Sequence, residues 1–258
     1  MASQGLQAAA RPPHTRLRIS VIVCAWNEAA TIGPCLASLL AQRRCPDQII
    51  VVDNASTDGT GDRAAAFPGV QVVREPRKGL TRAREAGRLA ATGDIIACLD
   101  ADCRAPDDWL VGIERRFLRS SIIALTGPFR YYDWDVPGRL ALRAYDTVAA
   151  PLAQFIVRDV LDLGALLYGG NFAVRRDALA AIGGFDTGIE FHGEDTNLGR
   201  RLHRVGRVVL ARECTMCTSA RRFHAMGRGA VLRLYARNFW HELLWHRPAD
   251  TAHVDVRR

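Results

Sequence analysis

The chain has 258 residues and a formal net charge of +8, with 35 Lys and Arg against 27 Asp and Glu. Its 48% hydrophobic and 24% charged residues exclude a disordered or collagen-like chain, and its length fits one α/β domain with additions better than several small domains. The positive charge favours anionic partners such as phosphates or acidic lipids, but the sequence lacks zinc-finger spacing and a basic helix followed by heptads, so we expect no nucleic-acid binding.

Residues 1–16 contain Gln, Ala, Pro and Arg without an apolar core or a cleavage site, so we expect a flexible extension. No run of about 18 uncharged apolar residues follows, which predicts that no helix spans a membrane. Seven scattered cysteines, several of them in apolar runs, fit reduced thiols in a cytoplasmic protein. Cys214 and Cys217 form a Cys-x-x-Cys pair, which we interpret as structural because no second pair stands at zinc-site spacing.

Strand-like and helix-like segments alternate through the first half of the chain. We expect strands at 18–24, 48–52, 70–74 and 94–99, and helices at 31–41, 60–66 and 80–91. This alternation predicts an α/β fold with a mostly parallel central sheet flanked by helices. Ligands bind such sheets beyond the carboxyl ends of the strands, so the polar residues there are candidates for one cleft. They are Trp26, Asn27 and Glu28 after the first strand, Asp53 after the second, and Asp100 and Asp102 after the fourth.

The second half is less regular. We expect a helix over 139–163 that is interrupted at Pro151, a strand at 171–175 and a helix over 196–205. Near the end, Leu232, Tyr235, Phe239 and Leu243 fall on one helical stripe among arginines and tryptophans. Residues 229–258 are therefore predicted to form an amphipathic helix and tail. This helix either packs on the domain or, through 229–247, contacts a membrane peripherally at its cytoplasmic face.

Asp100-Ala101-Asp102 ends a buried strand with two carboxylates. Mg²⁺ and Mn²⁺ prefer oxygen ligands and commonly link one or two protein carboxylates to substrate phosphates, which matches a pair at a strand end. For an isolated Asp-x-Asp, however, a solvated turn is the better explanation. The neighbouring sequence has to decide between the two.

Three segments, VIVCAWNEAATIGPCLASL, IIVVDNASTDGT and GDIIACLDADC, resemble the family 2 glycosyltransferases in order and spacing. YGGNFAVRRDALAAIGGFD and GEDTNLGRRL look like the acceptor segment and the Glu-Asp motif of that family. The resemblance spans roughly 18–222 and implies a GT-A fold with an acceptor-side extension. Residues 17–228 would then form a single domain, with a nucleotide-sugar half over 17–128 and an acceptor half over 129–228.

The resemblance also assigns roles on the donor side. Glu28 and Asp53 would hold the nucleoside, beside Trp26 and Asn27, and Arg82 would lie near the phosphates. Asp100 would meet the ribose or a metal-bound water, and Asp102 would ligate Mn²⁺ or Mg²⁺, with His224 as a further candidate ligand. A turn or helix cap at Asp53, a solvated helix face at Arg82 and a surface position for His224 are the structural alternatives.

On the acceptor side, the resemblance implies that Asp195 is the general base and that Glu194, Gly169, Gly170 and Asn171 lie near the acceptor. It implies an inverting transfer of one sugar from a nucleotide-diphosphate sugar to a hydroxyl of a glycan, a lipid-linked molecule or a small molecule. The resemblance does not identify the sugar or the base, and among the possible donors we favour a UDP-sugar. An ordinary helix cap is the alternative for Asp195. No Gln-x-x-Arg-Trp motif is present, which argues against a polymer synthase.

Two other functions share parts of this pattern. A nucleotidyltransferase also combines a nucleotide, a metal and an α/β sheet, but its first loop is usually rich in glycine, whereas this chain has Ala25-Trp26-Asn27-Glu28. A catalytically silent module could bind a sugar nucleotide without turning it over, although the intact Asp-x-Asp and Glu-Asp motifs count against it.

Overall fold

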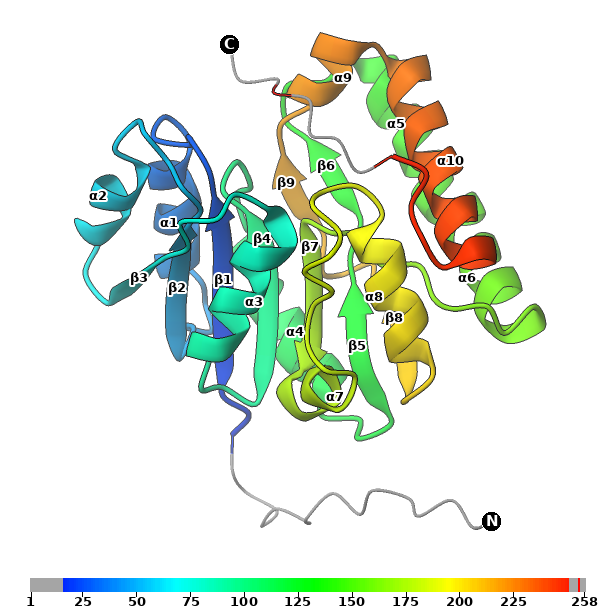
Figure 1. Ribbon diagram of the computed structural model, residues 1–258, viewed down its shortest axis with the longest axis horizontal. Coiled ribbons are helices and arrows are strands. Elements are labelled where there is room, and N and C mark those ends of the chain that lie inside the picture. The colour runs from blue at the N-terminus through cyan, green and yellow to red at the C-terminus, as the bar shows by residue number, and fades with distance from the viewer. Residues whose placement is uncertain (1–15, 251–254, 256–258) are drawn as a thin grey trace.

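The computed structural model describes residues 16–250 and Asp255. The predicted flexible extension therefore lies, apart from Arg16, outside the described residues. The first half contains β1 (Ile19–Ala25), α1 (Ile32–Leu40), β2 (Gln48–Asp53), α2 (Thr60–Ala65), β3 (Val70–Arg74), α3 (Leu80–Ala90), β4 (Ile95–Asp100), α4 (Trp109–Phe117) and β5 (Ile122–Thr126). The strands and helices predicted for this half are all present (Figure 1).

The second half adds a long helix, four strands, and four further helices. Its elements are β6 (Phe129–Tyr131), α5 (Val136–Ala144), η1 (Tyr145–Ala149), α6 (Ala150–Phe155), η2 (Ile156–Val160), β7 (Asn171–Arg175), α7 (Arg176–Ala181), α8 (Glu194–His203), β8 (Arg207–Leu210), β9 (Met216–Thr218), α9 (Arg221–Met226) and α10 (Arg228–Trp245). None of the helices within the described residues is long and apolar enough to cross a membrane.

The central sheet has the strand order β3-β2-β1-β4-β7-β5-β8, and β6 pairs with β9 in a small second sheet. Only β7 runs antiparallel, so the predicted mostly parallel sheet is confirmed. The register pairs Ala25 with Asp53 and Cys24 with Asp100. The loops after β1, β2 and β4 therefore leave the sheet at one edge, which is the upper edge in Figure 1. Because β7 lies between β4 and β5, the two predicted halves share one sheet.

Apolar side chains fill both faces of this sheet. Val21 and Val23 of β1 join one cluster with α1 and α4, while Ile22 joins the other with α3 and α8. This alternation follows from the two-residue repeat of a strand. A sheet covered on both faces holds its strand ends in fixed positions, which the loops beyond them inherit.

The helix expected over 139–163 begins at Val136 and is not interrupted at Pro151. Pro151 has no N–H to donate to the Thr147 carbonyl four residues earlier. The preceding turn, η1, is π-helical, with the Ala150 N–H bonded to the Tyr145 oxygen, and Nη2 of Arg212 donates to the Thr147 carbonyl instead. The predicted break at Pro151 is therefore wrong, because a wider turn and an arginine accommodate the proline.

The predicted apolar stripe on the last helix is also partly wrong. In α10, Leu232 is 60% exposed, whereas the polar residues Asn238 and Glu242 are buried beside Leu243. Glu242 Oε1 accepts hydrogen bonds from the Arg200 guanidinium at 3.0 Å and from Asn197 Nδ2 at 3.0 Å. A buried ion pair, more than an apolar stripe, thus attaches α10 to α8.

Candidate functional site

The loop after β1 is shaped by polar contacts with the loop after β2. Asn27 adopts a left-handed φ of 51°, and its side-chain oxygen accepts a hydrogen bond from the Thr57 N–H at 2.8 Å. The Glu28 N–H donates to Thr60 Oγ1 at 2.8 Å. Trp26 lies under the Lys78 ammonium, which is 3.2 Å from the ring centroid. The three predicted donor-site residues of this loop are therefore held at the sheet edge, with the Glu28 side chain buried.

Asp53 ends β2 beside an open cavity of about 400 Å³. Its Oδ1 accepts a hydrogen bond from the Ser56 N–H at 3.1 Å, as expected for a turn-closing aspartate. The absence of a side chain at Gly61 leaves room for its Oδ2. The cavity walls include the 55–62 loop and residues 74–76. Asp53 thus both closes a turn and borders a space suited to a flat, polar ligand.

The Asp-x-Asp pair follows β4 at the centre of the same edge. The Asp100 side chain is 45% exposed, whereas Asp102 is nearly buried. Burial, together with the nearby Asp100 and Glu28 carboxylates, raises the pKa of Asp102 to about 6 against the opposing effect of Arg221. These carboxylates form a concentration of negative charge that a cation would stabilise.

These carboxylates fit a divalent cation that is bound together with its substrate. Among the residues described, no group of three or more His, Cys, Asp and Glu side chains is arranged to hold a metal ion. Mg²⁺ and Mn²⁺ commonly take one or two protein carboxylates and complete their shell with water and substrate phosphates. The hard oxygen donors of Asp100 and Asp102 suit such an ion.

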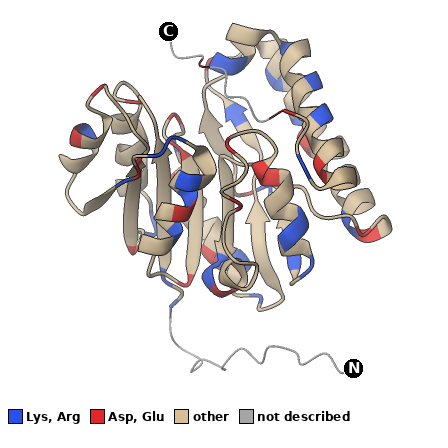
Figure 2. Ribbon diagram, in the orientation of Figure 1, with Lys and Arg blue, Asp and Glu red and all other residues tan. Residues whose placement is uncertain are grey.

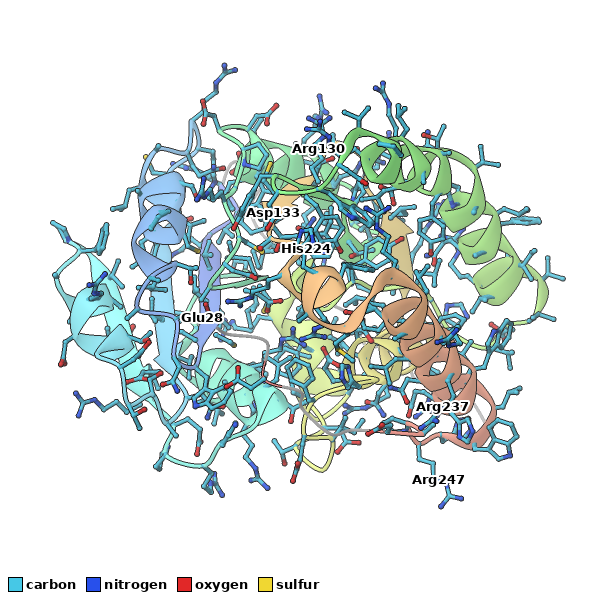
Figure 3. All side chains as sticks on the ribbon, turned by 90° about the horizontal axis from the view of Figure 1, so that it is seen from above. Glu28, Arg130, Asp133, His224, Arg237 and Arg247 are labelled. Carbon is cyan, nitrogen blue, oxygen red and sulfur yellow. The ribbon has the colours of Figure 1, made fainter. Side chains whose placement is uncertain are left out.

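Arg221 at the start of α9 occupies the position where His224 was expected. Its guanidinium donates to both carboxylate oxygens of Glu28 and lies 3.1 Å from Asp102 Oδ2. His224 is exposed, and its Nε2 lies 3.3 Å from the Asp133 carbonyl oxygen. Figure 3 shows His224 beside Asp133 and away from Glu28. The structure does not bring His224 to Asp102, because α9 turns that ring outward.

Gly169 and Gly170 are the point where the donor and acceptor motifs meet. A Cβ atom at Gly169 would overlap the Glu194 carboxylate, and one at Gly170 would overlap the Asp100 carboxylate. Consecutive glycines thus let the end of β4 and the start of α8 approach the same short segment. Asp100 and the Glu194–Asp195 pair, almost a hundred residues apart in the sequence, belong to one site.

Arg84 of α3 connects these groups, and Arg82 does not. The Arg84 side chain is 2% exposed, with Nη1 3.0 Å from Glu194 Oε1 and Nη2 3.8 Å from Asp100 Oδ1. Nη2 also donates to the Gly169 carbonyl. Although burial alone would lower the pKa of Arg84, the Glu194 and Asp100 carboxylates raise it overall, so the guanidinium stays charged.

The predicted position of Arg82 near the phosphates stays a prediction, and the buried arginine of this helix is Arg84, two residues later. Arg82 is partly exposed and lies against Gly79 at the start of α3. The buried face of α3 consists of Thr81, Ala83, Arg84 and Gly87. The helical repeat of small residues at 83, 87 and 91 already indicates that position 84 faces inward.

Glu194 and Asp195 begin α8. Asp195 Oδ1 accepts a hydrogen bond from the Thr196 N–H at 2.7 Å. Burial raises the pKa of Glu194 to about 7, with the Asp195 charge adding to the effect, and burial also raises the pKa of Asp195. Both carboxyls are therefore easier to protonate than ordinary ones.

Asn171 has a structural position rather than a place on the acceptor side. It is 1% exposed, and its side-chain oxygen accepts from Trp109 Nε1 at 3.0 Å while its Nδ2 donates to the Cys214 carbonyl at 2.8 Å. Its amide is thus used inside the protein. The predicted acceptor role of Asn171 is corrected to that of a tether between β7 and the loops beside it.

The family described as Glycosyl transferase family 2 matches residues 20–183, which include the Asp-x-Asp pair and the two glycines. The chain belongs to glycosyl transferase family 2. The resemblance inferred from the sequence motifs is thereby confirmed, and the prediction of a glycosyltransferase holds at the level of the family.

Curated relatives in this family differ in length and organism. Glycosyltransferase AglE of Haloferax volcanii is 26% identical over 214 residues, which cover 80% of this chain and 68% of that protein. Polypeptide N-acetylgalactosaminyltransferase 10 of Rattus norvegicus is 30% identical over 154 residues, or 51% of this chain and 24% of the rat protein. The chain thus spans only a part of the longer relatives.

Solved structures share the fold at low sequence identity. The mannosyltransferase PcManGT from Pyrobaculum calidifontis, in complex with GDP-Man and Mn²⁺, has a TM-score of 0.68 and 23% identity, covering 92% of this chain and 66% of that chain. Glucosyl-3-phosphoglycerate synthase from Mycobacterium tuberculosis, in complex with Mn²⁺, UDP-Glc and phosphoglyceric acid, has a TM-score of 0.58 and 24% identity, covering 92% of this chain and 85% of that chain. The predicted GT-A fold is confirmed.

The contrast between Arg84 and Arg82 gives a test of the buried network. Replacing Arg84 by Leu leaves Glu194 without its cation, so we expect the free energy of unfolding to fall by about 3–5 kcal/mol. Arg82→Leu, on the same helix, should change it by less than about 0.5 kcal/mol. Urea denaturation at about pH 8, where Glu194 is mostly ionised, measures both. Equal effects of the two variants would contradict the network.

Proposed function

We propose that the chain is an inverting glycosyltransferase that moves one sugar from a nucleotide-diphosphate sugar to an acceptor hydroxyl, with a divalent metal ion and with Asp195 as general base. The convergence at Gly169 and Gly170 carries this proposal. It places a partly exposed strand-end carboxylate, Asp100, next to the helix that begins with Glu194 and Asp195. A donor-side group and a candidate base in one site are what a single displacement needs.

The donor would be held by the loops at the upper sheet edge. Asp53 and its cavity suit the nucleobase, and Glu28 suits the base or the ribose, because carboxylates accept hydrogen bonds from imide N–H groups and hydroxyls. Asp102 would ligate Mn²⁺ or Mg²⁺, with Asp100 contacting the ribose or a water on the ion. When bound, the ion supplies positive charge that stabilises the leaving diphosphate.

The acceptor hydroxyl is activated from the opposite side. Asp195 takes the hydroxyl proton while the oxygen forms a bond to the anomeric carbon, and the bond from that carbon to the diphosphate oxygen breaks. Attack opposite the leaving group inverts the anomeric configuration. Arg84 keeps Glu194 in place beside Asp195 and limits how far negative charge accumulates there.

The solved relatives guide the choice of donor. PcManGT was crystallised with GDP-Man and the Mycobacterium tuberculosis synthase with UDP-Glc, each with Mn²⁺. We favour a UDP-sugar for this chain, and thermal stabilisation by UDP-, GDP- and dTDP-sugars with Mn²⁺ distinguishes the three, because a bound ligand raises apparent stability. No stabilisation by any of them would count against a nucleotide-sugar enzyme.

Asp102→Ala should weaken Mn²⁺-dependent binding of the donor by at least about tenfold, because the ion loses a protein carboxylate. Isothermal titration of the UDP-sugar with Mn²⁺ and with EDTA measures the effect. Asp107→Ala, an exposed aspartate just beyond the same strand, is the matched control and should bind like the wild type. If the wild type binds the donor equally well in EDTA, the metal assignment is wrong.

Asp195→Asn should lower the rate of transfer by about 10²–10⁴-fold while donor affinity stays unchanged, because the amide cannot accept the proton. The rate is followed by release of the nucleoside diphosphate. Asp177→Asn is the control, since Asp177 Oδ1 also accepts the N–H of the next residue, at 2.7 Å, but on the exposed start of α7. Unchanged turnover in Asp195→Asn would remove the base assignment, and a wild type that binds donor without turnover would favour a silent module.

The raised pKa values of the Glu194 and Asp195 pair predict an acidic limb in the pH profile. The base must be unprotonated, so kcat/KM should fall by about tenfold per unit as pH drops below the pKa of Asp195, which burial raises above the usual aspartate range. An ordinary aspartate would place this limb near pH 4. Initial rates between about pH 5 and pH 9 locate the limb. A profile that stays flat down to about pH 5 would contradict the raised pKa values.

A further inference from the structure

The long helix from Val136 to Val160 presents an apolar face to solvent. We call this face the apolar ridge and define it by Leu140, Val148, Leu152, Phe155, Ile156 and Val160. These side chains are between 39% and 65% exposed. The helix lies at the β8 end of the sheet, on the right in Figure 1. At about 1.5 Å per residue the helix is about 35 Å long. The ridge is therefore an apolar surface much larger than the single exposed leucines that are common on proteins.

The ridge is not needed to hold the helix on the protein. Ala150, Gln154 and Val157 face inward, and Gln154 Nε2 donates to the Val208 carbonyl at 3.2 Å. Arg158 Nη1 donates to the same carbonyl at 3.0 Å. Hydrogen bonds to the edge strand β8 therefore hold much of the helix on the protein, and the larger apolar side chains point away from that strand.

The two π-helical turns help to keep the ridge continuous. Each turn contains an N–H bonded five residues back, from Ala150 to Tyr145 in η1 and from Leu161 to Ile156 in η2. A turn of this kind holds an extra residue and so shifts the residues after it back around the axis. In a straight α-helix, residues spaced three, four or eight apart gradually move around the helix axis. The extra residue in each π-helical turn reverses part of this movement and keeps the ridge residues on one face.

Exposed arginines flank the first half of the ridge. Arg139 and Arg143 are exposed and form no ion pair with any residue that the structure describes, whereas Asp159 pairs with Arg158 at 2.6 Å. Asp146 is half-buried and faces Arg212. α10, at the same end of the sheet, carries further arginines (Figure 2). Its Arg233, Trp240 and Trp245 are exposed.

Aromatic residues connect the ridge to the site. Trp134, directly before α5, packs on Phe223 at 5.0 Å and on Tyr131 at 4.8 Å between ring centroids. Phe129 contacts Tyr131 and Tyr168 and borders Gly170. The first turn of α5, whose N-terminus is capped by Asp135, thus stands beside the acceptor side of the cleft.

We propose that the apolar ridge binds the surface of an anionic bilayer, and that the acceptor hydroxyl is carried by a lipid of that bilayer. The second part rests on the proposed function. A bilayer supplies an apolar layer for the ridge and negative headgroups for Arg139 and Arg143, with tryptophans at the level of the headgroups. In a symmetric pair of ridges, by contrast, unpaired arginines would face one another. The contact lies on α5–η2 rather than only on the 229–247 segment that the sequence indicated.

Sedimentation with sucrose-loaded vesicles tests the binding surface. We expect the wild type to bind vesicles of equal parts phosphatidylcholine and phosphatidylglycerol and to bind phosphatidylcholine alone much less. The double variant Leu152→Ser/Phe155→Ser should bind the anionic vesicles about tenfold less or weaker still. Leu89→Ser/Leu118→Ser is the matched control, because these leucines are even more exposed but lie elsewhere, and it should bind like the wild type.

Three results would overturn the proposal. They are no binding of the wild type to anionic vesicles, equal loss of binding in the ridge and control variants, or a wild-type dimer in sedimentation velocity that the ridge variant converts to monomers.

A charge variant tests the arginines separately. Arg139→Gln/Arg143→Gln leaves every apolar side chain in place and should reduce both vesicle binding and its salt dependence. Circular dichroism of all variants shows that the fold is retained.

Donor binding separates this proposal from the proposed function. The ridge variant should be stabilised by the UDP-sugar with Mn²⁺ as much as the wild type, because the ridge lies outside the donor cleft. If the wild type binds vesicles but no nucleotide sugar, the proposed function fails and the membrane surface stands. If transfer is faster to soluble hydroxyls than to lipid-linked hydroxyls in the same vesicles, the lipid acceptor is wrong although the surface remains.

Discussion

The buried guanidinium of Arg84 holds the two sides of the site together. It is 2% exposed and faces Glu194 of α8, the Gly169 carbonyl and, at 3.8 Å, Asp100 at the end of β4. A buried cation is tolerated only with good partners, and removal of any partner leaves an uncompensated charge. The positions of α3, β4 and α8 therefore depend on one another, and the distance between the donor-side carboxylates and Asp195 is set by this one group.

The sheet supplies the proposed donor side, and the glycine pair joins the proposed acceptor side to it. Because β1, β2 and β4 are parallel and in register, their polar ends reach the same edge, where hydrogen bonds such as that from the Thr57 N–H to Asn27 connect the loops. Gly169 and Gly170 add a segment without side chains, against which the Asp100 and Glu194 carboxylates pack. At the outer rim, Arg221 of α9 pairs with Glu28 and Asp102, which balances negative charge in the part of the cleft where a cation fits.

The helices beyond the sheet edge extend this arrangement outward. Glu242 of α10 is fully buried against Arg200 of α8, so the helix that carries Asp195 in its first turn is held by α10. The long helix at the β8 edge is attached through Gln154 and Arg158 and keeps its apolar ridge free. Because buried polar contacts hold these helices in place, the exposed apolar ridge is free to contact an apolar partner. The fold does not depend on that contact.

The sequence by itself determined the alternating strands and helices, the parallel sheet, the family and the motifs at the strand ends, because these follow from local periodicity and short spacings. Only the tertiary structure decided that Arg84 meets both Glu194 and Asp100, that Asn171 is a tether, that His224 turns outward and that the proline at 151 does not break its helix. These outcomes depend on which partner a side chain meets across long sequence separations, and on compensating contacts such as that of Arg212, which no local pattern encodes.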